Sequence, residues 1–139
     1  MKKTLNSFLL LLALVICLFS CAAPADFGEL WEDATYVEDT EFGNGETTVN
    51  VEVKAGEHSV SFTINTDKTT LGEALLEHSL IEGEDSQYGL YVKKVNGILA
   101  DYDINGSYWG FYKNGEYMMS GVDSTEIADG EHYELVYEK

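Results

Sequence analysis

Two neighbouring stretches of strict alternation constrain the fold more than any other feature of the sequence. Residues 47–54 and residues 59–64 each place an apolar side chain at every second position, with polar side chains between. The apolar positions are Val49, Val51, Val53, Val60, Phe62 and Ile64. This period is typical of strands with one buried face. The turn formers at 55–57 join the two stretches, so the sequence predicts a β-hairpin whose apolar face needs a cover.

The segment after the hairpin predicts that cover. Thr70 stands three residues before Glu73, which is the spacing of a capping box at a helix start. The residues that then share one helical face are Leu71, Ala74, Leu75 and His78. We expect a helix over about residues 70–79. Gly72 weakens it by about 1 kcal/mol relative to alanine, so packing must supply the rest of its stability.

The remainder of the chain is typical of strands. The candidates are residues 89–95, 98–99, 108–113, 116–119 and 132–138, with Asn-Gly hairpin signals at 96–97 and 114–115. One helix among many strands predicts an α+β fold rather than a parallel α/β one. We therefore expect a single domain over residues 47–139: an N-terminal β-hairpin, one helix, then several antiparallel strands.

The first twenty residues predict export. Two lysines precede an apolar run from Phe8 to Phe19, which at about twelve residues is well short of the roughly 20 that span a bilayer. Such a pattern indicates a removable secretory signal over residues 1–20. The ending Leu-Phe-Ser-Cys resembles the bacterial lipobox, which implies a lipid on Cys21 and a location on the extracytoplasmic face of the cell membrane. An ordinary signal with an unmodified cysteine is the alternative.

Charge narrows the classes of partner. Without the two leading lysines, the chain has 6 lysines and 25 acidic side chains, which give a formal charge of about −19. Arginine is absent. Such a surface repels phosphate backbones, so we expect no nucleic-acid partner. Residues 21–46 are acidic with little periodicity, which favours a flexible tether, although Phe27, Leu30 and Trp31 could dock onto the domain instead.

Catalytic patterns are lacking in the sequence. His58, His78 and His132 are widely spaced, and neither a Gly-x-Ser-x-Gly elbow nor a glycine-rich phosphate loop occurs. The only cysteines are Cys17 and Cys21, so the domain has no disulfide or thiol nucleophile. We expect a protein that is not an enzyme.

One segment copies part of a calcium loop. Asp101, Asp103, Asn105 and Gly106 match its first half, but Tyr112 stands where the loop requires a bidentate glutamate. An ordinary polar turn is the better interpretation, and we expect no metal site.

Aromatic residues gather in the C-terminal half. In a strand over 108–113, Trp109 and Phe111 would share one face, and Tyr108 and Tyr112 the other. If one face is buried in the core, the other stays partly exposed and suits a large flat ligand. The alternative is that these rings only pack across strands.

Several segments together resemble a known family. Tyr-Trp-Gly-Phe-Tyr-Lys-Asn-Gly at 108–115, Gly-Val-Asp at 121–123 and Asp-Gly at 129–130 resemble the transcobalamin-like C-terminal domain. The helix start at 70–75 and the hairpin at 95–98 resemble those of the same family, and the likeness covers about residues 47–139. Gly110 departs from it, because larger apolar residues are common there. The resemblance implies a β-grasp-like domain.

The resemblance also implies a ligand. In animal cobalamin carriers this domain covers one side of the cobalamin, and a helical barrel, absent from this chain, covers the other. The resemblance implies a corrinoid ligand facing Tyr108, Trp109, Tyr117 and Gly121, with a helical-barrel or transporter partner. We expect no cofactor besides this ligand. The alternative is a surface module that docks on a protein or a glycan and binds no small molecule.

Overall fold

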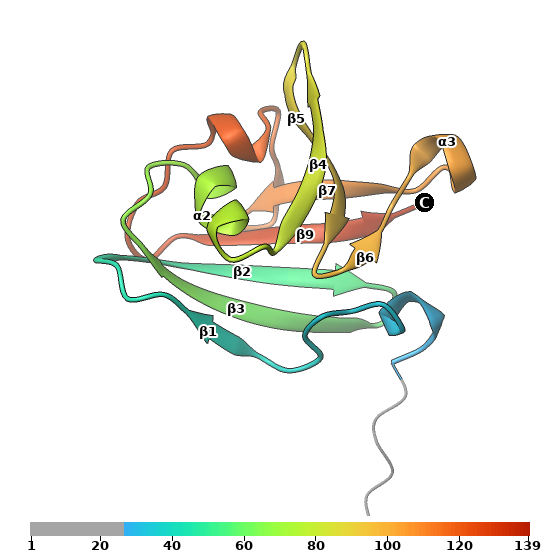
Figure 1. Ribbon diagram of the computed structural model, residues 1–139, viewed down its shortest axis with the longest axis horizontal. Helices are drawn as coiled ribbons and strands as arrows, with labels where there is room; N and C mark the ends of the chain where they lie inside the picture. Colours follow the sequence, from blue (N-terminus) through green and yellow to red (C-terminus); the bar gives the residue numbers. More distant parts are fainter. Residues whose placement is uncertain (1–26) are drawn as a thin grey trace, which may run out of the picture.

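The structure is a computed structural model that describes residues 27–139 (Figure 1). The predicted signal, Cys21 and residues 22–26 of the expected tether lie outside this range. The elements, with η for a 3-10 helix, are η2 (Glu29–Trp31), β1 (Thr40–Phe42), β2 (Thr47–Ala55), β3 (His58–Thr66), α2 (Leu71–Glu77), β4 (Ile81–Ser86), β5 (Gly89–Val95), β6 (Ile98–Leu99), α3 (Tyr102–Asn105), β7 (Tyr108–Lys113), β8 (Glu116–Tyr117), η3 (Val122–Ser124) and β9 (His132–Glu138).

The predicted hairpin is confirmed and forms the middle of the larger sheet. β2 and β3 pair antiparallel along their whole length, and the strand order is β1-β3-β2-β9-β7-β8. β9 pairs antiparallel with β7 but parallel with β2, and β1 runs parallel to β3. The strands after the helix are therefore not all antiparallel to their neighbours, contrary to what the sequence analysis expects, because β9 runs parallel to β2. The sheet is mixed because β9 returns to the central strand only after the chain has crossed the domain.

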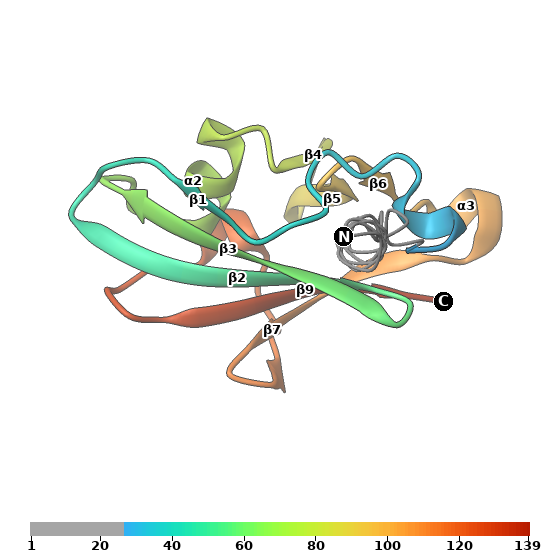
Figure 2. The same cartoon turned by 90° about the horizontal axis from the view of Figure 1, so that it is seen from below.

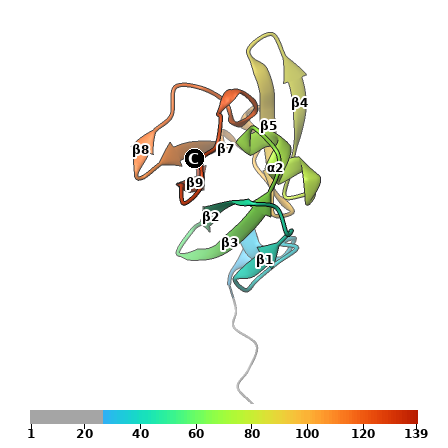
Figure 3. The ribbon, with the colours of Figure 1, turned by 90° about the vertical axis from the view of Figure 1, so that its left-hand side faces the viewer.

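A smaller sheet of β4, β5 and β6 lies with α2 on one side of the larger sheet (Figures 1 and 3). The fold is thus a mixed α+β domain of two sheets with few helices, as the sequence predicts at that level. β4 was not predicted because only Ile81 among its residues is buried and its other side chains are mostly acidic. A strand exposed on both faces leaves no alternation to detect.

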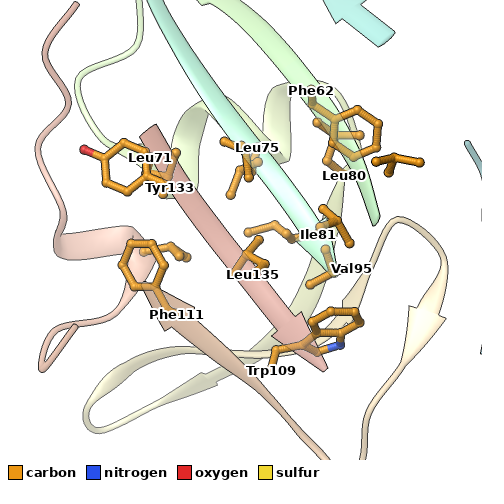
Figure 4. Packing of buried hydrophobic residues seen from close by; sticks show 14 of the residues in the cluster. Phe62, Leu71, Leu75, Leu80, Ile81, Val95, Trp109, Phe111, Tyr133 and Leu135 are labelled. Carbon is orange, nitrogen blue, oxygen red and sulfur yellow. The ribbon is translucent and has the colours of Figure 1, made fainter. Parts of the chain in front are cut away.

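The core lies between α2, the smaller sheet and the larger sheet (Figure 4). Both apolar rows of the hairpin are fully buried there, together with Leu71, Ala74 and Leu75 of α2. β7 and β9 add Trp109, Phe111 and Leu135 from the same face. The helix therefore covers the face that the alternation required it to cover.

The predicted helix start is confirmed. The Glu73 N–H donates to Thr70 Oγ1 at 3.3 Å, and the Thr70 N–H donates to Glu73 Oε2 at 3.2 Å, which completes the capping box. The helix ends at Glu77, two residues before the expected end at Ser79. Ser79 has a φ of 55°, outside the helical region, and the chain there turns into β4.

We expect Gly72→Ala to destabilise the domain, although alanine favours helices by about 1 kcal/mol. A Cβ at Gly72 would lie 2.8 Å from the Cα of Asp123, so the backbone of η3 would have to move. Overpacking of this kind costs about 1–3 kcal/mol, and we expect a net loss in urea unfolding. A gain in stability would show that η3 moves away from α2 freely.

The expectation of a flexible tether is wrong for residues 27–46. Trp31 is only 4% exposed, and its Nε1 donates to the carbonyl oxygen of Ala55 at 2.9 Å. Phe27, Tyr36 and Phe42 pack against the same core, and β1 adds an edge strand to the larger sheet. Burial of these aromatic side chains outweighs the local excess of negative charge, which had favoured a solvated segment.

The other helical segments are short. α3 occupies the half-matched calcium loop: Asp101 caps it by accepting from the Asp103 N–H at 3.0 Å, and Gly106 ends it with a left-handed φ of 75°. Across residues 27–139, no helix has the length and hydropathy that crossing a membrane requires.

Candidate functional site

A groove of about 400 Å³ lies beside β7, between the β4–β5 hairpin and the segment 117–122. Its lining residues are Tyr88, Leu90, Tyr91, Val92, Tyr108, Trp109, Phe111, Tyr117, Met118, Met119, Ser120, Gly121, Val122 and Leu135. The four residues that the sequence analysis selected as ligand contacts, Tyr108, Trp109, Tyr117 and Gly121, all belong to this lining. The fold thus brings together residues from four separate segments: 88–92, 108–111, 117–122 and Leu135 of β9.

The groove has a buried floor and an exposed rim. Trp109 and Phe111 point from β7 into the core and form the floor (Figure 4). Tyr108 and Tyr117 stand on the rim, where Tyr117 is 59% exposed. The expectation that one face of β7 is buried and the other partly open is confirmed, because Trp109 is 9% exposed and Tyr108 is 38% exposed.

None of the groove-lining side chains carries a charge. This is unusual for a chain with a formal net charge of −17. Aromatic rings, aliphatic side chains and two methionines form most of the surface, and the Tyr hydroxyls and Ser120 supply polar groups. Such a lining suits a ligand with a flat or apolar body and a few polar substituents.

Asp123 ties the two walls of the groove together. Its Oδ2 accepts from the Leu90 N–H at 3.1 Å, so η3 is bonded to the start of β5. Gly89 permits this contact: its φ is 101°, and a Cβ there would meet Asp123 Oδ2 at 2.6 Å. Gly121 likewise leaves room for the other carboxylate oxygen, 2.8 Å from where its Cβ would lie. Gly121 therefore helps to shape the wall through its lack of a side chain.

Trp109 offers an unused hydrogen-bond donor. Its Nε1 is buried and has no acceptor among residues 27–139, and its ring meets that of Tyr137 edge-on at 5.7 Å. A buried donor left without an acceptor costs about 1–3 kcal/mol. An oxygen atom of a ligand or a water molecule near the indole would remove that cost.

A second group of tyrosines adjoins the rim on the outer face of the larger sheet. The Tyr112 hydroxyl donates to Glu138 Oε1 at 2.5 Å, and Tyr108 lies opposite Glu138 in the pairing of β7 with β9. The Tyr117 ring meets the Tyr112 ring edge-on at 5.5 Å. Gly110 lies between the two β7 tyrosines, and a Cβ there would come within 3.0 Å of Glu138 Cδ. The glycine lets the carboxylate lie close to the strand.

We expect Tyr112 to titrate abnormally. The hydrogen bond to Glu138 raises the pKa of Tyr112 to about 12, and the interaction with the same carboxylate raises the pKa of Tyr108. Because the neutral phenol is favoured by folding, this contribution to stability is present below about pH 10, the unfolded value, and is lost as pH rises through about 12. In an ultraviolet titration, Glu138→Gln should move both pKa values toward the ordinary one. Unchanged phenolate absorbance would contradict the contact.

The sequence analysis did not predict the wall of the groove that lies opposite β7. Tyr88, Leu90, Tyr91 and Val92 come from the β4–β5 hairpin, and Met118–Ser120 come from the segment after β8. Tyr88 and Tyr91 belonged to the noted excess of aromatic residues, which was the only available signal. Which strand of the smaller sheet approaches β7 depends on long-range packing that periodicity does not report.

The acidic and histidine side chains do not gather into a ligand set. Between Phe27 and Lys139, no three His, Cys, Asp or Glu side chains converge as a metal site would require. His132 instead contacts Asn50, with Nδ1 and Oδ1 3.1 Å apart, and His78 lies against the ring of Phe42. The part of the chain that the structure describes thus offers a groove rather than a metal centre.

The groove and its two-sheet frame define a small α+β domain with a groove lined by aromatic residues. The family model of a domain of unknown function, DUF4430, matches residues 68–139, and the chain belongs to that family. The matched region includes every residue that lines the groove.

Solved structures agree with this fold. The chain is 33% identical to a candidate metal-binding protein from Ruminococcus gnavus ATCC 29149, with a TM-score of 0.65 over 68% of this chain and 98% of that one. It shares the fold of part of haptocorrin in complex with Cbi, at 19% identity and a TM-score of 0.57, over 70% of this chain and 26% of haptocorrin. A search of the curated proteins finds no match. The likeness to cobalamin carriers is thus supported at the level of the fold.

Proposed function

We propose that this chain is a binding protein, not an enzyme, and that it captures a small molecule in the groove, with a corrinoid such as cobalamin as the leading candidate. The observation that carries the proposal is the uncharged, ring-lined groove on a strongly acidic chain. The fold shared with haptocorrin supports a corrinoid among flat ligands, as does the resemblance to the transcobalamin-like domain and its β-grasp-like relatives.

The groove is large enough to hold part of a corrinoid but not to enclose it. Its volume of about 400 Å³ lies in the range of small-molecule sites, which bury about 70–90% of a ligand. Haptocorrin extends well beyond the region that this chain matches. We therefore propose that a second protein, a helical barrel or a transporter, covers the other side of the ligand.

The description of the R. gnavus relative as metal-binding does not lead us to propose an ion site here, because residues 27–139 hold no converging set of three ligands. A corrinoid carries cobalt within its own ring, so its capture requires no metal ligands from the chain. Contacts to the ring edges and to the amide substituents would suffice.

The test is a titration of the purified domain with cyanocobalamin, followed by the visible spectrum of the corrinoid and by thermal unfolding. At 100 times the dissociation constant, a ligand adds about 2.7 kcal/mol to stability. Tyr117→Ala should weaken binding. Tyr102→Ala is the matched control, since Tyr102 is 64% exposed but lies on α3, outside the groove. The absence of any effect, with or without a helical-barrel protein, would remove the corrinoid proposal.

We propose that the domain is held at the extracytoplasmic face of the cell membrane by a lipid on Cys21. The lipobox-like ending of the predicted signal supports this location. Labelling cells with a radioactive fatty acid should mark the wild-type chain and leave Cys21→Ala unmarked. A wild-type chain that carries no label and is released into the medium would contradict it.

Docking on a surface protein or glycan is the second candidate. Tyr88 and Met119 on the rim are almost fully exposed, which suits a partner broader than a small molecule. If this candidate is correct, the wild-type chain should retain a partner in a pull-down and Tyr88→Ala should lose it. Neither the wild-type chain nor the variant should then bind a corrinoid.

A further inference from the structure

Glu138 lies at the junction between the groove and the outer face of the larger sheet. Tyr108 lines the groove and lies opposite Glu138 in the pairing of β7 with β9. Tyr117 also lines the groove, and its ring contacts Tyr112, whose hydroxyl donates to Glu138 at 2.5 Å. A ligand in the groove would therefore have a carboxylate within reach at the rim.

No lysine or histidine neutralises this carboxylate within residues 27–139. Lys54 pairs with Glu134 at 2.7 Å, and Lys113 pairs with Glu131 at 2.6 Å, but no such ion pair reaches Glu138. The Tyr112 phenol donates a hydrogen bond to it, which does not remove the charge. Glu138 differs in this respect from Glu134, its neighbour on the same face of β9.

The surroundings of Glu138 favour a cation. Tyr112 bonds to the carboxylate, Tyr108 lies opposite Glu138 on β7, and the Tyr117 ring contacts the Tyr112 ring. The face of a tyrosine ring attracts a cation. The hydrogen bond from Tyr112 and the close approach over Gly110 fix the position of the carboxylate before any ligand arrives. An anion would meet both this charge and the net charge of the whole chain.

We propose that Glu138, Tyr108, Tyr112 and Tyr117 form a subsite for an organic cation at the rim of the groove. Ligands of the groove that carry an ammonium or guanidinium group gain this contact, whereas cyanocobalamin, which carries neither group, binds without it. The inference rests on the proposed function of the groove and adds a preference for positively charged ligands at its rim.

The test uses three probes that share one ring and differ in charge: 3-(trimethylammonio)phenol, its neutral isostere 3-tert-butylphenol, and the anion 3-hydroxybenzenesulfonate. Binding to the domain is followed by NMR shifts of the backbone amides. We expect the cation to bind about tenfold more tightly than the neutral isostere, with the anion weakest. Added salt should reduce the preference for the cation.

Glu138→Gln should reduce the preference for the cation to about twofold or less. Glu134→Gln is the control, because it removes the same charge from the same face of the strand while Lys54 already neutralises that charge. Equal binding of the cation and the isostere by the wild-type domain would overturn the cation subsite and leave ligand capture standing. A domain that binds cyanocobalamin but none of the three probes would also overturn it. If neither cyanocobalamin nor any probe binds, the proposed function fails as well.

Discussion

Replacing Trp31 with alanine is expected to lower the free energy of unfolding by about 3–5 kcal/mol, the usual cost of removing a buried aromatic side chain. Trp31 is part of the core cluster, and its ring contacts that of Phe27 at 5.9 Å. The substitution also leaves the carbonyl oxygen of Ala55, at the end of β2, without the indole N–H that bonds to it. Urea unfolding measured by circular dichroism gives the change.

Val37→Ala is the control for this variant. Val37 lies in the same segment but is 45% exposed, and its truncation should change stability by less than about 0.5 kcal/mol. A loss below about 1 kcal/mol for Trp31→Ala would mean that residues 27–46 behave as the flexible tether that their composition suggests.

Asn96→Ala is expected to cost about 2–4 kcal/mol, because it leaves two partly buried backbone groups unpaired and places alanine at a left-handed φ of 51°. The side chain is 1% exposed, and its amide bonds the backbone of Tyr36 twice: the Tyr36 N–H donates to Oδ1 at 2.9 Å, and Nδ2 donates to the Tyr36 oxygen at 2.8 Å. Asn96 thus substitutes for a strand partner of the N-terminal segment. Urea unfolding would again report the loss.

Asn114→Ala is the control that measures the backbone part of this loss. Asn114 also precedes a glycine in a tight turn and has a φ of 50°, against 51° for Asn96, but its side chain is exposed. Both variants place alanine in the left-handed region, at a cost of about 1–2 kcal/mol. The difference between them therefore measures the bonds to Tyr36. Equal losses would show that those bonds contribute nothing.

Local pattern was sufficient to predict the elements whose burial is visible within a few residues. Val49, Val51 and Val53 specify β2 because each second side chain enters the core. Thr70 and Glu73 specify the start of α2 because the capping contacts lie within one turn. The Asn-Gly turn at 114–115 places β8 beside β7 for the same reason.

Contacts between distant segments could not be predicted in this way. The hydrogen bonds from Asn96 to Tyr36 join positions 60 residues apart, and the acidic sequence around Tyr36 contains no pattern that predicts them. The position of β4 could not be predicted for a similar reason. Its acidic side chains pair with Lys93 and Lys94 of the next strand instead of entering the core. Periodicity reports burial against the core and says nothing of pairing at an exposed edge.

Local alternation also predicted part of the candidate site. Alternation along β7 placed Trp109 inside and Tyr108 outside, as the structure has them. The family resemblance added Tyr117 and Gly121, which also line the groove. The opposite wall, including Tyr88 and Met118, is set by the bond between η3 and β5 through Asp123, which no sequence pattern specifies.

Capture of a flat ligand by the groove is tested most directly by NMR mapping of the domain during titration with cyanocobalamin. The account predicts that the largest shifts fall on the amides of residues 88–92 and 117–122, on both walls of the groove, with Trp109 Nε1–H among them. Shifts confined to another hollow, such as the one formed by Phe27, Gly56 and His58 at the tip of the β2–β3 hairpin, would contradict it.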